Sequence, residues 1–233
     1  MRDSEVLRDL KFSYCNREEF NSLLNNITGN IELSVFHLNI HSLNKNSAKL
    51  YNFLQLINLD FDAIIISEIW AYNIELYQNL FPNCVFCYDL PLVSNVGGVG
   101  IYVKNTLTHR CLDDLKIPSL DNCTIDNMWL ETVKGSKKYI IGKIYRHPGQ
   151  NLGKFGEIFE KTEKRKVPCV IAGDFNVDLM KYGAHSITSY YVDNLLIHNF
   201  FPTIVMPTRF AQQSATIIDH IYFSPGCKSI SDN

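Results

Sequence analysis

The residues of this sequence whose types and positions could do chemistry are six polar side chains that each follow an apolar run. They are Asn39, Glu68, Tyr145, Asp174, Asn176 and Asp219. Glu68 is the sharpest of them, because it closes a run of apolar residues and a carboxylate at the end of a buried strand needs a partner. A divalent cation is a natural partner, since Mg²⁺ takes a few hard oxygen ligands and completes its shell with water and phosphate oxygens.

The other polar side chains fit the chemistry of a phosphate ester. Asp174 and Asp219 could orient a water molecule or a histidine, and Asn39 and Asn176 could donate hydrogen bonds to phosphate oxygens. The spacing gives this chemistry limited support, because capped and solvated strand ends would show the same pattern.

The stretch from Gly173 to Asn176 lies at the centre of the pattern. It follows the apolar run at 168–172, which is typical of a strand buried on both faces. On an extended backbone, Asp174 and Asn176 would point the same way and place a carboxylate and an amide beside one reacting group. Gly-Asp-x-Asn is also good turn chemistry, so a plain turn remains the alternative.

Strands and helices that would position these side chains can be read from the apolar periodicity. A strand at 32–40, a helix at 44–58 and a strand at 61–68 form a unit of the length expected for a crossover between parallel strands. A short helix is predicted within residues 18–24. Further strands are predicted at 84–88, 97–103, 127–133, 139–145, 168–172 and 216–223, with helices at 153–164 and 182–199. This order predicts two packed sheets with helices outside, an α+β sandwich.

Gly97 and Gly98 stand beside an apolar run. They fit a turn that enters a strand with close backbone packing. No helix and no Lys-Ser/Thr pair follows them, which excludes a phosphate-binding P-loop.

Composition sets wider limits. The chain has 233 residues, 46% of them hydrophobic, which is enough for one sizeable core. Its net charge of -2 gives no overall basic field, so polyanion binding has to come from a local patch or a bound cation. Seven cysteines without a paired framework favour a reducing, intracellular compartment. No apolar run reaches the roughly 18 residues of a membrane-spanning helix, so we expect no membrane association.

Six segments, taken in order, resemble the endonuclease/exonuclease/phosphatase superfamily. Within this superfamily they resemble the apurinic-type endonuclease domain encoded by non-LTR retrotransposons. The segments are 36–43 around Asn39, 64–70 around Glu68, 97–103, 144–148 around Tyr145, 173–176, and 216–221 around Asp219. The resemblance implies a four-layer α/β/β/α sandwich, in which helices flank two packed mixed β-sheets.

The resemblance also implies a role for each residue. Glu68 would bind magnesium or manganese with Asn39 near it, and Asp174 would position or activate the attacking water. Asn176 would hold the scissile phosphate, and Tyr145 would contact that phosphate in the transition state. The metal would stabilise charge on the phosphate and on the leaving 3′-oxygen.

Asp219 would orient the family's catalytic histidine rather than touch the metal. Thr208 stands where the family often has a supporting hydroxyl. DNA contact is expected from Thr208 and from basic side chains along one edge, namely Arg146, Arg209, Lys104 and Arg110. All of these are equally compatible with solvated loop and surface positions.

The sequence departs from the family at its end. The family closes with Ser-Asp-His and a last core strand, whereas this sequence reads Ser231-Asp232-Asn233. Asp232 matches the aspartate and would join the metal site, while Asn233 stands in the place of the histidine. His220 is expected to be a core histidine and not a substitute. We therefore expect a leader at 1–30 and a domain at 31–233 that is C-terminally incomplete, with its final strand missing.

Three functions stay open at this level. The first is a Mg²⁺-dependent DNA endonuclease that leaves a 3′-hydroxyl, encoded together with a reverse transcriptase domain and acting in the nucleus. The second is an inactive remnant that still binds DNA. The third is a phosphatase or phosphodiesterase on the same fold, because fold does not settle function.

Overall fold

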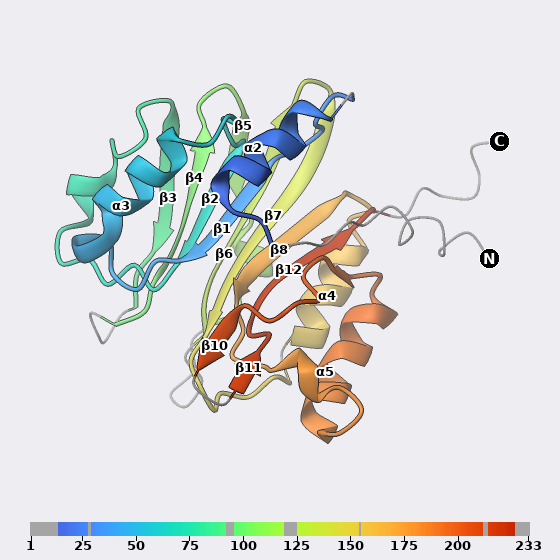
Figure 1. Cartoon of the computed structure of the whole chain (residues 1–233). Helices are drawn as coiled ribbons and strands as arrows, with labels where there is room; N and C mark the ends of the chain where they lie inside the picture. The colour runs from blue at the N-terminus through green and yellow to red at the C-terminus, as the bar shows by residue number, and fades with distance from the viewer. Residues whose placement is uncertain are drawn as a thin grey trace.

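The structure is a computed structural model that describes residues 14–27, 29–91, 96–118, 125–153, 155–211 and 214–226. Its architecture is a four-layer sandwich, in which two mixed sheets pack face to face and helices cover their outer faces (Figure 1). The predicted fold class is confirmed. Asp232, Asn233 and the expected loss of a final strand lie outside the described residues.

The smaller sheet has the strand order β1-β2-β4-β3. Its members are β1 (Val35–Asn39), β2 (Ala63–Ser67), β3 (Cys84–Asp89) and β4 (Val99–Lys104). β1 and β2 run parallel because helix α3 (Leu43–Gln55) returns the chain between them, as the strand-helix-strand pattern predicts. Every residue of β2 is buried, which explains its uninterrupted apolar sequence.

The larger sheet has the order β5-β6-β7-β8-β12-β9. Its strands are β5 (Thr108–Cys111), β6 (Ile125–Lys134), β7 (Lys137–Arg146), β8 (Cys169–Asp174), β9 (Phe201–Pro202) and β12 (Asp219–Ser224). β7 and β8 run parallel, with helix α4 (Phe155–Glu163) between them in sequence. Helix α5 (Ser186–Ile197) follows β8, after a short 3₁₀ turn at Leu179–Lys181.

Three apolar clusters fill the three interfaces of the four layers. Alternate residues of β2 face opposite ways, so Ile64 and Ile66 pack with α3 while Ala63 and Ile65 pack against the other sheet. The third cluster lies between the larger sheet and helices α4 and α5, and its centre includes Phe155. Each sheet is therefore buried on both faces.

Several short elements escape prediction from the sequence. β5, β9, β10 (Arg209–Ala211) and β11 (Ser214–Thr216) have between two and four residues and show no clear apolar alternation. The predicted strand at 216–223 is interrupted, and its two parts belong to β11 and β12. Short 3₁₀ turns lie at Ile74–Tyr77 and Asp113–Leu115. Helix α2 (Arg17–Asn25) confirms the predicted N-terminal helix and begins with a capping box at Asn16.

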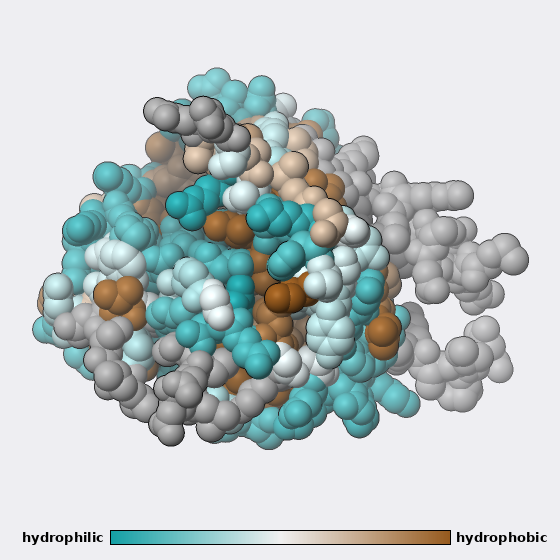
Figure 2. Space-filling model, turned by 90° about the horizontal axis from the view of Figure 1, so that it is seen from below, coloured by the Kyte–Doolittle hydropathy of each residue, from teal (hydrophilic) through white to brown (hydrophobic). Residues whose placement is uncertain are grey.

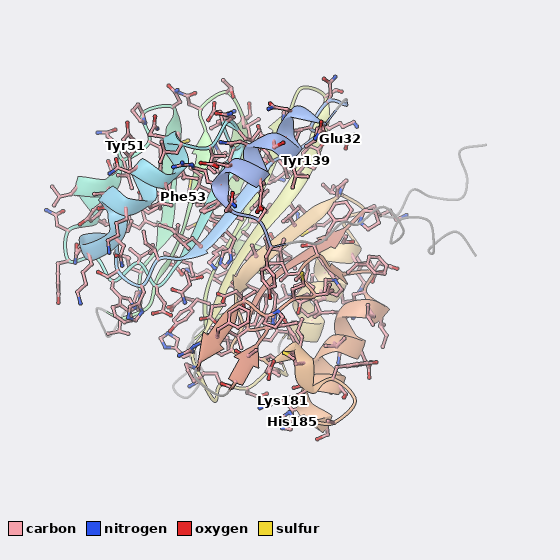
Figure 3. All side chains as sticks on the ribbon, in the orientation of Figure 1. Glu32, Tyr51, Phe53, Tyr139, Lys181 and His185 are labelled. Atoms are coloured by element: carbon pink, nitrogen blue, oxygen red, sulfur yellow. The ribbon has the colours of Figure 1, made fainter. Side chains whose placement is uncertain are left out.

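One end of the sandwich is closed by ion pairs. Asp62 accepts hydrogen bonds from Lys134 Nζ at 2.8 Å and from the Ser34 backbone N–H at 2.8 Å. Glu32 pairs with Lys137 and lies beside Tyr139 at the same end, opposite to the end that holds Lys181 and His185 (Figure 3). The candidate site lies at the other end of the two sheets. None of the described helices combines the length and the apolar character needed to cross a membrane.

Candidate active site

Four strands of the larger sheet bring polar residues into one transverse row. Asp126 pairs with Tyr145, Tyr145 pairs with Asp174, and Asp174 pairs with Asp219 across β6, β7, β8 and β12. Because residues in register lie side by side on one face, three carboxylates and a phenol line the end of this sheet. Tyr145, Asp174 and Asp219 were predicted from the sequence. Asp126 was not, because it begins a strand instead of ending one.

Asn39 joins the two sheets at this row. Its Nδ2 donates to Glu68 Oε1 at 2.6 Å and to Asp174 Oδ2 at 2.9 Å. Glu68 follows β2, Asn39 ends β1 and Asp174 ends β8, so three distant segments meet at one amide group. The predicted convergence of Asn39, Glu68 and Asp174 is present in the structure.

The backbone around Glu68 is strained. Positive φ angles occur at Glu68 (54°), Trp70 (39°), His41 (48°) and Ser42 (94°), and among these residue types only His is enriched in this region. Hydrogen bonds hold the two loops together, since the Ser42 N–H donates to Glu68 O at 2.8 Å. Such conformations persist only where the surrounding structure imposes them, and they gather at functional sites.

His41 is a site residue that the sequence pattern did not single out. Its Nδ1 lies 2.9 Å from Glu68 Oε2, and its ring packs on Trp70 with 4.1 Å between ring centroids. The His41 side chain is 66% exposed whereas that of Glu68 is 11% exposed. His41 therefore covers Glu68 at the mouth of the site, and its position two residues after Asn39 is the signal that could have identified it.

The Asp174-Phe175-Asn176 segment is a turn as well as a part of the site. Asn176 has a φ of 49°, and its N–H donates to Asp174 Oδ1 at 3.0 Å. The expectation that Asp174 and Asn176 project the same way from an extended backbone is wrong, because the chain leaves β8 in a left-handed turn. The Asn176 side chain instead donates to Arg146 O at 2.8 Å.

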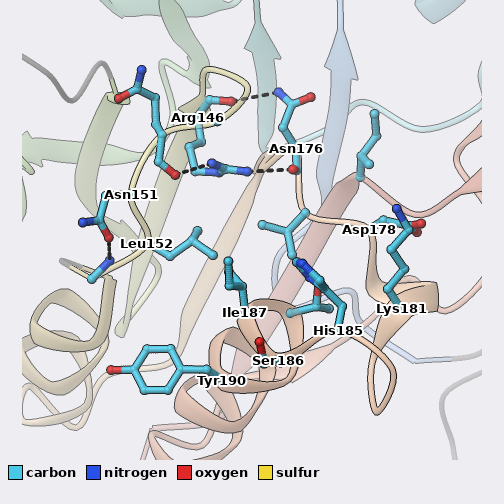
Figure 4. Close-up of a pocket in the computed structure, with 16 residues that line it drawn as sticks. Arg146, Asn151, Leu152, Asn176, Asp178, Lys181, His185, Ser186, Ile187 and Tyr190 are labelled. Carbon is cyan, nitrogen blue, oxygen red and sulfur yellow. Dashed lines mark hydrogen bonds between the residues drawn. The ribbon is translucent and has the colours of Figure 1, made fainter.

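Arg146 braces this turn. Its guanidinium donates to Phe175 O at 2.6 Å. It also donates to Asn176 O at 2.6 Å and to Gln150 O at 2.5 Å (Figure 4). The side chain is buried, with 6% of the residue exposed. These contacts are those of a structural brace, and the DNA contact expected of Arg146 stays a prediction.

The two carboxylates at the ends of β8 and β12 both have a raised pKa. Burial raises the pKa of Asp174 to about 6, and the charge of Asp219 adds to the effect, while the N–H of Asn176 opposes it. Burial also raises the pKa of Asp219, against the hydrogen bond from Thr208. Among the described residues, Asp219 Oδ1 is buried without a hydrogen-bond partner. A buried carboxylate oxygen without a hydrogen-bond donor, next to a second carboxyl group of raised pKa, is typical of a functional site.

Thr208 supports Asp219 from the loop before β10. Its Oγ1 accepts from the Ile218 N–H at 3.3 Å and from the Asp219 N–H at 3.2 Å. This placement agrees with the supporting hydroxyl that the resemblance implies. Arg209, the next residue, is exposed on the same strand pair, so its expected DNA contact remains a prediction.

Lys104 and Arg110 do not lie along this edge. Lys104 ends β4 at the side away from Val99, which is the residue in register with Ser67. It pairs with Asp60 at 2.9 Å, and Arg110 pairs with Glu131 at 2.9 Å. The expectation that both line the DNA-binding edge is wrong, because strand direction places them at the opposite end.

His220 is a core residue. It is fully buried, with Nε2 3.0 Å from Ile217 O and Nδ1 accepting from Tyr222 Oη at 2.9 Å. Its ring stacks on Phe175 with 5.1 Å between centroids. Burial lowers the pKa of His220 to about 4. The structural role expected for His220 agrees with this position.

A glycine turn fixes one flank of the row. Asp126 Oδ2 accepts from the Gly98 N–H at 2.8 Å and lies 3.3 Å from His147 Nε2. The His147 ring packs edge-on against Tyr145, with 4.6 Å between centroids. A Cβ at Gly97, where φ is 111°, would lie 2.5 Å from Asp126 Oδ2. The close backbone packing predicted for this turn therefore positions Asp126, His147 and Tyr145.

Lys143 lies below the row and is fully buried. Its Nζ donates to Ser67 Oγ, contacts His37 Nε2 at 3.1 Å and donates to Ile144 O at 3.3 Å. Burial lowers the pKa of Lys143 to about 7, while the carboxylates of Asp174, Asp219 and Glu68 oppose this shift. Burial and the charge of Lys143 also lower the pKa of His37.

A pocket of about 860 Å³ opens beside Asn176 (Figure 4). The loop after β7, the turn after β8 and the start of α5 form its walls, with Lys181, His185 and Tyr190 among the lining residues. The lower end of the molecule is largely hydrophilic across its middle, with hydrophobic side chains set among the polar ones (Figure 2). The pocket and the row of carboxylates are thus neighbours through Asn176.

The oxygen donors present fit a magnesium site of low protein coordination. Among the described residues, no three His, Cys, Asp or Glu side chains gather in a metal-holding cluster. Glu68 and the Asn39 amide could nevertheless hold Mg²⁺, which binds through one or two carboxylates and otherwise keeps water or phosphate oxygens. A cation that demands many protein ligands would not fit.

Comparisons with known proteins agree with the resemblance noted in the sequence. The model of the endonuclease/exonuclease/phosphatase family matches residues 36–232. No curated protein matches the chain.

Solved structures of several activities share the fold. The endonuclease domain of TRAS1, a telomere-specific non-LTR retrotransposon, aligns with a TM-score of 0.60 and 13% identity, over 83% of this chain and 84% of that one. The mannosyl-6-phosphatase Bt3783 of Bacteroides thetaiotaomicron aligns with 0.56 and 15%, over 83% and 86%. The 3′ phosphatase NExo from Neisseria, bound to a product DNA hairpin, aligns with 0.55 and 15%, over 83% and 87%.

Proposed function

Because the chain belongs to the endonuclease/exonuclease/phosphatase family, we propose that it is a magnesium-dependent DNA endonuclease of a non-LTR retroelement. It would hydrolyse one phosphodiester bond and leave a 3′-hydroxyl. The observation that carries this proposal is the Asn39 amide bridging Glu68 and Asp174, because three segments far apart in sequence are held there in one hydrogen-bonded group. Such an arrangement is suited to binding a phosphodiester group.

Glu68 and Asn39 would hold the metal. Mg²⁺ or Mn²⁺ bound there would supply positive charge for the phosphate and for the leaving 3′-oxygen. The strained loop at Glu68 presents the carboxylate in a fixed position, so little reorganisation is needed when substrate binds. Asp232, expected to join the site, lies outside the described residues and stays part of the proposal.

Asp174 would accept the proton of the attacking water. Burial and Asp219 raise the pKa of Asp174 to about 6, which brings its proton affinity toward neutral pH and favours its use as a general base. Tyr145, in register with Asp174, would donate its phenolic O–H to a phosphate oxygen. Asn176 would hold the same phosphate through the amide that now donates to Arg146 O.

Asp219 would orient the family's catalytic histidine, in whose place this sequence has Asn233. Within the described part of the chain the Asp219 Oδ1 is buried without a hydrogen-bond partner, which supports that role because such an atom needs a donor. DNA as substrate is supported by the likeness to the TRAS1 endonuclease domain and to NExo, whose structure holds a product DNA hairpin. A reverse transcriptase partner and a nuclear location are part of the proposal, because the 3′-hydroxyl left at the nick in chromosomal DNA could prime a reverse transcriptase.

A plasmid-nicking assay tests the proposal. We expect supercoiled plasmid to become open circles in the presence of Mg²⁺ and to stay supercoiled with EDTA. The nick should prime extension by a DNA polymerase, which requires a 3′-hydroxyl. Glu68→Ala should abolish nicking, while Asp62→Asn, at the far end of the sheets, should leave it. No nicking, even after extension of the chain through a Ser-Asp-His ending, would contradict the endonuclease proposal.

The alternatives give different results in the same experiments. The likeness to the mannosyl-6-phosphatase keeps a phosphatase or phosphodiesterase open. Release of phosphate from small phosphomonoesters, without nicking, would favour that activity. Salt-sensitive DNA binding without cleavage, even at excess protein, would favour an inactive DNA-binding remnant.

A further inference from the structure

Lys143 occupies a position where a lysine is costly. It lies on the inner face of β7, in the row formed by Met128, Lys143, Ala172 and Ile221. This row is one step below the row of Asp126, Tyr145, Asp174 and Asp219, about 7 Å along the strands. Its other members are apolar, and Lys143 itself is fully buried. A buried amine without compensation is strongly unfavourable, so the groups around Lys143 must offset its cost.

The hydrogen bonds of Lys143 match those of an ammonium group. Ser67 Oγ, His37 Nε2 and Ile144 O surround Nζ, and an ammonium has three donors and no acceptor. His37 must then be neutral with its proton on Nδ1, because Nε2 accepts from Lys143. Two of the three acceptors belong to the opposite sheet, on β1 and β2. Lys143 therefore ties the sheets together beneath the site.

The charges nearest to this row are negative. Asp174 lies one step above Lys143 on the neighbouring strand β8, and Asp219 lies beside Asp174 on β12, the next strand along. Glu68 directly follows Ser67, to which Lys143 donates. Those carboxylates favour the charged lysine electrostatically. By reciprocity the lysine favours the charged carboxylates. Arg209 also favours the ionised form of Asp219, but Arg209 is exposed whereas Lys143 is fully buried between the sheets.

We propose that Lys143 is the internal counter-cation of this carboxylate cluster, holding the cluster together without metal and weakening its affinity for a divalent ion. Lys143 is then a positioning residue. The metal part of this inference rests on the proposed function, because it presumes that Glu68 binds the ion. The metal-free part rests on the contacts and charges alone.

The metal-free part is tested by a double-mutant cycle in EDTA at pH 6.5, where the Lys143 amine is mainly protonated and Asp174 is mainly ionised. Lys143→Met should lower the Tm by about 5–15 °C, because it leaves buried carboxylates without their cation. In the Asp174→Asn background the same substitution should lower the Tm by less than about half as much. Equal losses in both backgrounds would overturn the proposal, since a residue that only fills space has no charge coupling. If Lys143→Met does not fold, then Lys143→Met with Asp174→Asn should regain folding.

Thr132→Val supplies the matched control. Thr132 is also fully buried and lies on β6, and its Oγ1 has no hydrogen-bond partner among the described residues. Thr132→Val should change the Tm by the same amount in the wild-type background and in the Asp174→Asn background. A coupling as large as that of Lys143 would show that the cycle does not report on charge, and the proposal would fail.

The metal part is tested by calorimetric titration of Mg²⁺ and Mn²⁺ into substrate-free protein. Lys143→Gln keeps a donor for Ser67 and removes the charge, and it should bind the ion about tenfold more tightly than wild type. Thr132→Val should bind as wild type does. Unchanged or weaker binding by Lys143→Gln, with a wild type that binds, would overturn the metal part of the proposal. A wild type that binds neither ion would instead contradict the proposed function and overturn the metal part with it, leaving the double-mutant cycle to decide the rest.

Discussion

The two ends of the sandwich treat their buried carboxylates in opposite ways. At the closed end, burial tends to raise the pKa of Asp62, but hydrogen bonds from Lys134 and Ser34 outweigh it, and the pKa of Asp62 lies below its ordinary value. At the site end, burial and Asp219 raise the pKa of Asp174 to about 6. Asp62 has a cation and two donors from Ser34, whereas Asp174 faces a second carboxylate.

This difference separates a carboxylate that stabilises the fold from one that is available for chemistry. A carboxylate that is already paired with a cation and hydrogen-bonded gains little free energy from an added cation or proton. A cluster of like charges gains from either, and the fold tolerates the cost because apolar side chains fill the interface between the sheets.

The largest expected effect is on catalysis at the site end. Glu68→Gln keeps the size of the side chain and removes its charge, so we expect nicking with Mg²⁺ to fall by about 10³-fold or more. The Tm should stay within a few degrees of wild type, on the order of a 1 kcal/mol change. Initial rates on supercoiled plasmid and a thermal melt measure both. Nicking by Glu68→Gln at the wild-type rate would contradict the proposed role of Glu68 as a metal ligand.

At the closed end, the same kind of substitution should act on stability alone. Asp62→Asn breaks a buried pair with Lys134 and should cost about 3 kcal/mol, less than a fully dry pair because Lys134 is partly exposed. Since the pKa of Asp62 is lowered on folding, its contribution is present above about pH 4 and is lost as the pH falls through the folded value. Urea unfolding at pH 7 and pH 3 should therefore show a large and then a small difference from wild type.

The glycine turns at the two ends provide a second matched pair. Gly97→Ala, at φ 111° and 2.5 Å from Asp126 Oδ2, should cost about 2 kcal/mol more than Gly135→Ala. Gly135 also has a positive φ, 61°, but a Cβ there meets nothing within 4 Å. Gly97→Ala should also reduce nicking by displacing His147 from Tyr145. Equal costs at both glycines would show that the contact with Asp126 is unimportant.

Neutralising Asp174 should stabilise the metal-free protein. Because the pKa of Asp174 is raised on folding, its ionised form costs stability above about pH 6, and this cost fades as the pH falls toward its ordinary value of 3.8. Asp174→Asn should therefore raise the free energy of unfolding by about 1–2 kcal/mol at pH 7 and by little at pH 4. This pH dependence is opposite in sign to that of Asp62. A destabilised Asp174→Asn at pH 7 would contradict the contrast between the two ends.

The smallest expected effect concerns DNA affinity. Arg209 is exposed beside Thr208, and Arg209→Gln should weaken binding uniformly across DNA sequences while reducing the slope of log K against log salt by about 1. Arg110→Gln is the control, because Arg110 is paired with Glu131 at the opposite end. Fluorescence anisotropy at several salt concentrations measures both slopes. An equal change for Arg110 would place the DNA elsewhere than at the site end.

What the sequence by itself determined is the set of long elements and most of the site. Apolar periodicity over helix α3 and strands β1, β2, β7 and β8 indicates the sandwich, because burial on a sheet face imposes a pattern that needs no knowledge of partners. Glu68 and Asp174 stand out because a carboxylate after a buried strand has no local explanation. Short strands such as β5 were not predicted, because three or four residues are too few to show a clear apolar periodicity.

Only the tertiary structure decided which polar residues share one place. Strand register puts Asp126 in the row with Asp174 and moves Lys104 to the far end, and register depends on pairing between segments that are distant in sequence. In the sequence, Lys143 looks like an ordinary residue of a strand that has both polar and apolar side chains. Only the packing of the second sheet supplies its partners Ser67 and His37. Charge and burial at a site are properties of what surrounds a residue, and that surrounding is created when the two sheets meet.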